Sequence, residues 1–297
     1  MKRLLILSLI ALVLSAGCSS MKGTDDVFTV GIAWRDDTKS DAYNRLVSYF
    51  EMAGCRVIDL GKARTSDLEY YENGTLSDDY LNFDFSLTDE ASEILWNTEE
   101  IIVPSEINDV DIIVFSGGED VSPALYRKDY EPDFDYMYNT ERDASDFLLM
   151  RYAIENDIPV LGICRGMQVM AVASGLRLVE DIPSDYPDLE GVHRTADSKY
   201  SFHSVDITDN SSILYKLTQS DELAETASSH HQSVLFEPGH SLADTAYSGP
   251  ILEGMERTDK SFIVGVQFHP EYYSVHQDMK GAADAMMFIE NVISYLD

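Results

Sequence analysis

The sequence predicts an α/β protein built on a doubly wound, mostly parallel sheet. Short apolar runs rich in β-branched residues alternate with segments of helical spacing, which is typical of βαβ units and therefore of parallel strands. The length of 297 residues, with 44% hydrophobic and 25% charged residues, is ordinary for globular α/β domains. In such a sheet the functional loops lie at the carboxyl ends of the strands.

The first predicted βαβ unit lies near the start of the chain. VFTVGIAWR (27–35) indicates one strand and CRVIDL (55–60) indicates the next. Between them, residues 40–54 have helical spacing, with Ser40 as the expected N-cap and Gly54 as the expected stop. The apolar face of this helix consists of Tyr43, Leu46, Val47, Phe50 and Ala53.

The alternation then resumes after an interruption. Residues 61–107 are acidic and rich in tyrosine, and they are predicted to form an insertion or a lid. Further strands are expected at 110–120, 158–164, 204–207 and 261–268, and further helices at 145–157, 165–175 and 282–296. The prediction is therefore one domain over residues 27–297.

Residues 1–17 are predicted to be a lipoprotein-type signal peptide. Two basic residues precede the apolar run 4–14, which is shorter than the ~20 residues of a membrane-spanning helix. Small residues then lead to Cys18, which resembles the lipidated cysteine of a bacterial lipobox. Ser15 departs from that pattern and leaves ordinary signal cleavage as an alternative. Residues 18–26 would be a tether, and the protein is expected to be exported and lipid-anchored at a bacterial cell envelope.

The charge and the cysteine count exclude several kinds of partner and site. A net charge of −32 argues against binding to nucleic acid or to an anionic membrane surface. Three cysteines are too few for a disulfide framework, and the usual zinc spacings are absent.

Cys164 is the strongest candidate for chemistry. It lies between Gly162 and Gly166, where a predicted strand gives way to a predicted helix. A nucleophile elbow has this arrangement, because a sharp, strained turn exposes the side chain and only small neighbours fit beside it. The first turn of a helix also favours a thiolate. A buried packing cysteine is the alternative for this position taken alone.

A base and its orienting acid are predicted in GVQFHPEYY (265–273). Pro270 favours an extended backbone at the preceding residue, so His269 and Glu271 are expected to point to the same side. The carboxylate would then hold and polarise the imidazole, and Cys164 would supply the missing nucleophile.

An oxyanion site is predicted from FSGGEDVSPALY (115–126). Gly117 and Gly118 follow an apolar strand and leave backbone N–H groups free to face a ligand. Together with the N–H group of Arg165, they are expected to bind a developing oxyanion. A Gly-Gly pair alone more often marks a plain turn.

These motifs together resemble the class I glutamine amidotransferase superfamily, which carries a G-x-C-x-G elbow and a late H-P-E. Within it, SGGEDVSPALY, ERD (141–143), PVLGICRGMQ and SSHHQSV (228–234) are similar to the γ-glutamyl-γ-aminobutyrate hydrolase family, peptidase C26. The resemblance runs from about Thr29 to the C-terminus, without residues 61–107. It implies the flavodoxin-like fold of class I glutamine amidotransferases.

The resemblance also implies roles for individual residues. These are a triad of Cys164, His269 and Glu271, Gln168 as a ligand of the γ-glutamyl group, and a loop with His230 and His231 lining the site. Ser174 and Cys55 stand where the family usually has glycine, which leaves the exact substrate open.

The histidines outside the triad predict no metal site. His193, His203, His240 and His276 are scattered without metal-ligand spacing, although the first two match positions of the family. His230 and His231 are adjacent and cannot face one side of a strand. The expected reaction requires neither a metal nor an organic cofactor.

The expected function is hydrolysis of a small-molecule γ-glutamyl amide through a thioester on Cys164. The acidic composition favours a cationic leaving amine. Two alternatives stay open. A glutamine amidotransferase subunit would need a partner synthetase, and the chain carries no synthetase domain. A non-catalytic binding lipoprotein of the cell envelope would not need the three triad residues, which are all present.

Overall fold

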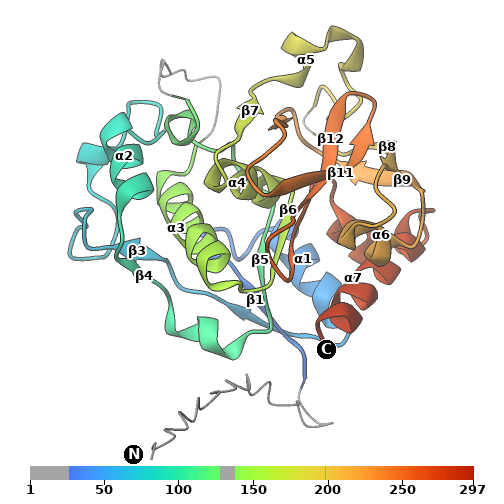
Figure 1. Cartoon of the computed structure of the whole chain (residues 1–297), viewed down its shortest axis with the longest axis horizontal. Helices are drawn as coiled ribbons and strands as arrows, with labels where there is room; N and C mark the ends of the chain where they lie inside the picture. The colour runs from blue at the N-terminus through green and yellow to red at the C-terminus, as the bar shows by residue number, and fades with distance from the viewer. Residues whose placement is uncertain (1–26, 128–137, 198) are drawn as a thin grey trace, which may run out of the picture.

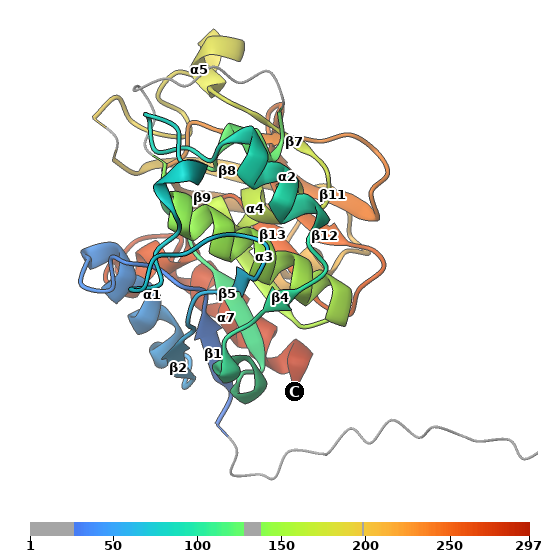
Figure 2. The ribbon, with the colours of Figure 1, turned by 90° about the vertical axis from the view of Figure 1, so that its left-hand side faces the viewer.

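The computed structural model describes residues 27–127, 138–197 and 199–297, and it contains a nine-stranded sheet with helices on both faces (Figures 1 and 2). The strand order is β2-β1-β5-β6-β13-β12-β11-β8-β9. The predicted doubly wound α/β fold is therefore confirmed. The predicted signal peptide, Cys18 and the tether lie outside the described residues. Over the described ranges, no helix has both the length and the apolar character of a membrane span.

Five strands of this sheet form its parallel half, and each coincides with a predicted strand. They are β1 (Thr29–Ile32), β2 (Arg56–Asp59), β5 (Ile112–Phe115), β6 (Val160–Ile163) and β13 (Ile263–Val266). All four pairings among them are parallel. The loops that follow β5, β6 and β13 carry the predicted motifs, so these motifs meet at one edge of the sheet.

Two layers of helices bury the two faces of the sheet. One layer contains α1 (Asp41–Met52), α6 (Ile213–Thr218) and α7 (Ala282–Leu296), and the other contains α3 (Thr140–Asn156) and α4 (Arg165–Ala173) with α2 (Asp89–Asn97) packed outside α3. Strand β5 serves both layers because successive side chains alternate between faces. Ile113 and Phe115 join the α3–α4 core, whereas Ile112 and Val114 join the α1–α7 core.

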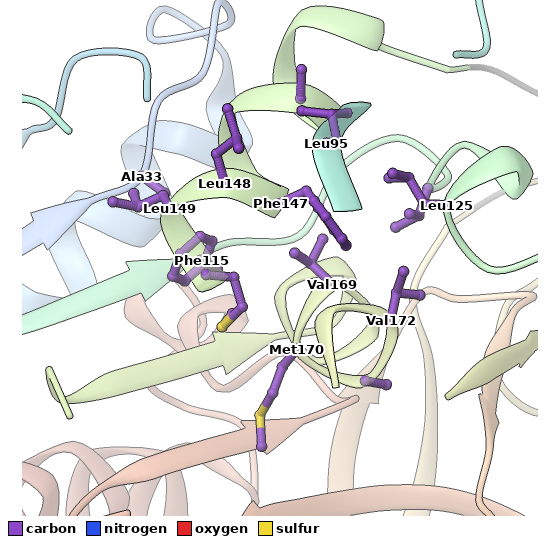
Figure 3. Close-up of a cluster of buried hydrophobic side chains, with 14 of the residues drawn as sticks. Ala33, Leu95, Phe115, Leu125, Phe147, Leu148, Leu149, Val169, Met170 and Val172 are labelled. Atoms are coloured by element: carbon purple, nitrogen blue, oxygen red, sulfur yellow. The ribbon is translucent and has the colours of Figure 1, made fainter. Parts of the chain in front are cut away.

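The α3–α4 core shows why these two helices hold the elbow in place. Phe147 of α3 lies between Leu95 of α2 and Val169 of α4 (Figure 3). All three side chains are at most 2% exposed. Helix α4, which follows Cys164, is therefore fixed in place by apolar packing at its middle.

The predicted helix ends were partly wrong. Helix α1 begins and ends as expected, since the Ser40 side chain accepts a hydrogen bond from the Tyr43 N–H group and Gly54 has a φ of +84°. Helix α3, in contrast, begins at Thr140 and not at residue 145, with Asn139 as its N-cap. The ERD motif therefore lies in its first turn.

The sequence did not predict the antiparallel half of the sheet beyond residues 204–207. It consists of β8 (Ser201–Ile207), β9 (Glu222–Ser228), β11 (Leu242–Ser248) and β12 (Ile251–Arg257). Residues of β8 alternate between buried and exposed, so this strand has no continuous apolar run to detect. A separate pair joins β7 (Arg177–Val179) to β10 (Ser233–Leu235).

The predicted insertion, residues 61–107, is packed on the domain. It contains β3 (Arg64–Thr65), α2 and β4 (Ile101–Ile102), and it lies against α3. The Leu87 N–H group donates to Ser122 Oγ at 3.0 Å, and Ser92 Oγ donates to the Ala124 carbonyl at 2.6 Å. The insertion therefore supports the 122–126 segment from outside.

Candidate active site

Cys164 occupies a strained turn between β6 and α4. Its φ of +52° and ψ of −105° are rare for a residue with a side chain. A Cβ atom at Gly166 would lie 2.0 Å from the Phe115 carbonyl oxygen, and one at Gly162 would lie 2.7 Å from the Gly166 carbonyl carbon. Both glycines are thus required for the close approach that forms the elbow. The turn places Cys164 in a cavity at the carboxyl edge of the sheet.

His269 and Glu271 are in contact, although not by the predicted route. His269 Nδ1 lies 2.6 Å from Glu271 Oε1. The backbone is not extended here, because Pro270–Ser274 forms a 3-10 turn that begins directly after His269. The expectation of an extended chain was therefore wrong, and the turn brings the carboxylate back to the ring.

The pKa of His269 is raised by this contact. Burial alone would lower the pKa of His269, but the Glu271 carboxylate outweighs that effect. Tyr200 and the Cys164 sulfur make smaller contributions in the same direction as Glu271. The pKa of His269 therefore lies well above its usual value. Because Nδ1 is taken by Glu271, Nε2 is the ring atom left for the sulfur. The arrangement favours a charged imidazole beside Cys164.

The glycine loop after β5 completes the cavity around Cys164. A cavity of about 220 Å³ is lined by Gly117, Gly118, Cys164, His269 and Glu271, among others. A Cβ atom at Gly117 would lie 2.8 Å from His269 Cε1 and 3.6 Å from Cys164 Cβ. The first position of α4 belongs to Arg165, whose N–H group has no acceptor within its own helix. Of the predicted oxyanion donors, Gly117 and Gly118 therefore line the same cavity as Cys164, and Arg165 directly follows Cys164 in the chain.

Two buried arginines, Arg142 and Arg165, hold the glycine loop and the elbow through side-chain contacts that sequence reasoning did not predict. Arg142 Nη2 donates to the carbonyl oxygens of Ser116 at 2.9 Å and of Gly117 at 3.1 Å. Arg165 pairs with Asp143 at 2.6 Å and also with Asp146. A Cβ atom at Gly118 would lie 1.9 Å from Arg142 Nη1, so the loop is shaped around this guanidinium. The ERD motif was the available signal, but a charged first helical turn also fits a solvated surface.

The other residues implied by the resemblance lie in different surroundings. Gln168 is buried on α4, with Nε2 at 3.4 Å from both the Gln232 carbonyl and Gln267 Oε1. His230 is buried, and its ring faces Glu253 of β12 instead of the Cys164 cavity. Its neighbour Ser229 lines that cavity. The predicted loop therefore reaches the Cys164 cavity through Ser229, whereas His230 and His231 line the neighbouring cavity.

His231 lies in a second, acidic cavity that shares Gly118 and Ser229 with the first. Its Nε2 atom lies 3.0 Å from Asp120 Oδ1, and its Nδ1 atom lies 3.2 Å from Asp181 Oδ1. Burial would lower the pKa of His231, but the two carboxylates raise it. The cavity has a volume of about 900 Å³, and its acidic lining residues are Glu119, Asp120, Asp181 and Glu190.

The insertion does not act as a lid over either cavity in this structure. Among the described residues, none from 61–107 lines the cavity of Cys164 or the acidic cavity. The lid expectation was therefore wrong for the described conformation, in which the insertion covers α3 and the 122–126 segment.

The fold brings together two of the histidines that are scattered in the sequence, His193 and His203. His193 Nδ1 lies 3.2 Å from His203 Nε2, and both rings lie beside His230 and Glu253. The expectation that these histidines are scattered was therefore wrong for His193 and His203. Burial is the main cause that lowers the pKa values of His203 and His230.

We expect Cys164 to react with iodoacetamide faster than Cys55 at neutral pH. Burial, with smaller contributions from two nearby carboxylates, raises the pKa of the Cys55 thiol to about 11, so about one molecule in ten thousand would carry the thiolate at pH 7. The raised pKa of His269 keeps an imidazolium beside Cys164 as the pH rises through neutrality. Peptide mapping after timed alkylation measures both rates. Equal modification of the two cysteines from about pH 6 to pH 8 would contradict this account.

Known protein sequences are similar to this chain over the region that carries the site. The sequence model of the peptidase C26 family matches residues 89–271. Protein NtpR of Enterococcus hirae is 32% identical over 169 residues, which cover 56% of this chain and 68% of that protein. A putative glutamine amidotransferase-like protein of Rickettsia prowazekii is 29% identical over 202 residues, which cover 55% of this chain and 71% of that protein.

Solved structures share the fold. The glutaminase domain of Trypanosoma brucei CTPS, solved with bound acivicin, has a TM-score of 0.52 at 17% identity and covers 91% of this chain and 94% of its own. A glutamine amido transferase from Methylobacillus flagellatus has a TM-score of 0.53 at 14% identity, with 92% and 96% covered. At such identities the likeness shows the fold alone. The family match covers more than half of the chain, so this protein belongs to the peptidase C26 family, and the family and these relatives together support a glutaminase-like hydrolysis of an amide bond.

Proposed function

We propose that the protein hydrolyses γ-glutamyl amides through a thioester on Cys164. The observation that carries the proposal is the cavity in which Cys164, the His269–Glu271 pair and the Gly117–Gly118 loop meet. A nucleophile, a base with its orienting acid and a set of backbone donors are the parts that acyl transfer requires.

In the first half-reaction, the Cys164 thiolate attacks the γ-carbonyl carbon. The carbonyl oxygen becomes an oxyanion, and the N–H groups of Gly118 and Arg165 stabilise it. The C–N bond then breaks, and the His269 imidazolium gives its proton to the leaving amine. The products are a free amine and a γ-glutamyl thioester on Cys164.

In the second half-reaction, neutral His269 removes a proton from water while the water oxygen attacks the thioester carbonyl. The C–S bond breaks, which releases glutamate and restores the thiolate beside the imidazolium. Glu271 keeps the ring oriented and stabilises its positive charge in both halves. All protons and electron pairs are accounted for without a further reactant.

The acidic cavity is the proposed place of the leaving amine. It opens beside Gly118, and its lining carries four carboxylate side chains against the side chains of Arg194 and His231, so the excess of negative charge favours a cationic amine over an anionic one. Burial would raise the pKa values of Glu119 and Asp181. The charge of Arg142 nevertheless helps to hold the pKa of Glu119 below its usual value. Hydrogen bonds from Ser184 and His231 hold the pKa of Asp181 below its usual value. The carboxylates of Glu119 and Asp181 therefore stay ionised at neutral pH.

A panel of γ-glutamyl amides tests the proposal. The leaving groups are a polyamine, γ-aminobutyrate and ammonia, the last supplied as glutamine. The γ-glutamyl amide of the polyamine should have the highest kcat/KM, and glutamate should be released from it at each turnover. Cleavage of glutamine alone would favour the amidotransferase alternative, and no turnover of any amide would favour the non-catalytic one.

One pair of variants separates the acidic cavity from the triad. Glu190→Gln removes an exposed charge that lines the cavity, and Asp188→Asn removes an exposed charge that does not. Glu190→Gln should raise KM a few-fold for the polyamine amide without changing kcat, whereas Asp188→Asn should leave both constants unchanged. Equal kinetics of the two variants would show that the leaving amine does not bind in this cavity.

A further inference from the structure

Four side chains converge beside the acidic cavity, which two of them line, and the proposed reaction uses none of the four. His193 comes from the segment before β8, His203 from β8, His230 from the loop after β9, and Glu253 from β12. One ligand atom from each lies within 4.8 Å of every other. This group of His193, His203, His230 and Glu253 is called the His₃Glu cluster below.

Four of the six separations between ligand atoms in the His₃Glu cluster are close to those of a tetrahedral metal site. Glu253 Oε1 lies 3.1 Å from His193 Nδ1, 3.4 Å from His230 Nε2 and 3.6 Å from His203 Nε2, and the first and last of these nitrogens are 3.2 Å apart. Ligands at about 2.0–2.1 Å from one tetrahedral zinc ion lie about 3.3–3.4 Å from each other. The four measured separations bracket that value.

The hydrogen bonds of the outer ring nitrogens orient two lone pairs toward the centre. His230 Nδ1 lies 2.9 Å from the Gln232 carbonyl, and His203 Nδ1 lies 3.1 Å from the Ser204 carbonyl. A nitrogen beside a carbonyl oxygen must carry the proton, so the Nε2 atoms of His203 and His230 are acceptors. Such backbone carbonyls are the usual outer partners of metal-binding histidines.

The centre of the cluster is consequently rich in acceptors and poor in protons. Within the part of the chain that the structure describes, His230 Nε2 and both carboxylate oxygens of Glu253 have no hydrogen-bond partner. Both side chains are more than nine-tenths buried. A proton on His193 Nδ1 could serve one acceptor and would leave the others facing each other unpaired. Buried acceptors in this state cost free energy unless a cation lies between them.

We propose that the His₃Glu cluster binds one divalent transition-metal ion, with zinc as the ion that fits best. Three imidazoles and one carboxylate in a tetrahedral arrangement form a donor set that zinc prefers over magnesium or calcium. All four positions are filled by protein, so the ion holds structure and does not activate water. This proposal departs from the sequence-based expectation of no metal, which rested on spacing along the chain, whereas these ligands come from four separate segments.

The metal would fix the loop that separates the two cavities. The His230 N–H group donates to the His193 carbonyl at 3.1 Å, so the two ligand segments already run side by side. Ser229, adjacent to His230, lines the Cys164 cavity, and the Gln232 carbonyl is shared by His230 and Gln168. An ion bound to β8, β12 and this loop would tie the loop to the sheet. This role does not depend on which amide is the substrate.

Metal analysis of the untagged protein tests the proposal. Protein purified from zinc-supplemented cells and passed over a chelating resin should contain one zinc ion per chain by inductively coupled plasma mass spectrometry. Replacement by Co²⁺ should give the intense visible absorption of a tetrahedral cobalt site. His203→Asn and Glu253→Gln should each lose most of the bound metal, and a chelator should lower the melting temperature of the wild type but not of these variants.

His240→Asn is the matched control. His240 is exposed, lies outside the cluster and has a φ of +56°, which asparagine tolerates. This variant should keep the full zinc content. Zinc-free wild-type protein that also fails to take up Co²⁺ would overturn the proposal, and so would equal zinc contents in His203→Asn, Glu253→Gln and the wild type. Neither measurement uses amide hydrolysis, so the result is independent of the proposed activity.

Discussion

Cys164→Ala should lower kcat/KM for γ-glutamyl amides by about 10⁴-fold or more, because both half-reactions form or break a bond to its sulfur. The substitution retains Cβ, so the strained backbone at φ +52° is unchanged. It removes one sulfur atom, and the free energy of unfolding should fall by no more than about 1 kcal/mol. Steady-state kinetics and a thermal melt of the same preparation measure the two quantities.

Variants of the other two triad residues should lose activity to different extents relative to Cys164→Ala. His269→Ala should be nearly as severe, since the general acid and the general base are both lost. Glu271→Gln should be milder, because an amide keeps a hydrogen-bond partner for His269 Nδ1 but removes the negative charge. A Glu271→Gln protein as inactive as Cys164→Ala would mean that the carboxylate does more than orient the ring.

Arg165→Met should destabilise the protein by about 3–5 kcal/mol, because it leaves the buried Asp143 carboxylate without a counter-charge and leaves Asp146 with only Arg142 at 3.4 Å. The Arg165 side chain is 1% exposed and pairs with Asp143 and Asp146, whose side chains are fully buried. Methionine has a similar length and stays apolar, so the loss measures the missing charge more than a cavity. Urea unfolding followed by circular dichroism gives the free energy.

Arg177→Met is the matched control for that prediction. Arg177 also pairs with a carboxylate, Glu237 at 3.3 Å, but both side chains are more than half exposed. Solvent screens such a pair, and its loss should cost less than about 1 kcal/mol. Equal destabilisation by the two substitutions would contradict the view that Arg165 is needed because its partners are buried.

The sequence predicted the parts of the fold in which one strand can be recognised without its neighbours. Strands β5, β6 and β13 are buried on both faces and appear as continuous apolar runs. Strands β9 and β11 alternate polar and apolar residues over short stretches, and such a pattern also fits loops. Their place in the sheet depends on pairing with β8, which no local pattern specifies.

The candidate site could be predicted to a similar extent. The positions of Cys164 and His269 follow from short motifs at strand ends, because the geometry there is set locally by glycine and proline. The Arg142 contacts and the His₃Glu cluster join segments far apart in the chain, and no spacing rule connects His193 with Glu253. The 3-10 turn at Glu271 shows that a contact can be predicted correctly for a wrong conformational reason.

Trapping the acyl-enzyme is the most direct test of the central claim, which is that amide cleavage passes through a thioester on Cys164. The wild-type protein would be mixed with an activated γ-glutamyl anilide, quenched in acid within milliseconds, and analysed by intact mass and peptide mapping. The account predicts a mass increase of one glutamyl group on the peptide that contains Cys164, reversed by hydroxylamine and absent from Cys164→Ala. Full turnover with no label on that peptide at any quench time, or turnover by Cys164→Ala at the wild-type rate, would contradict it.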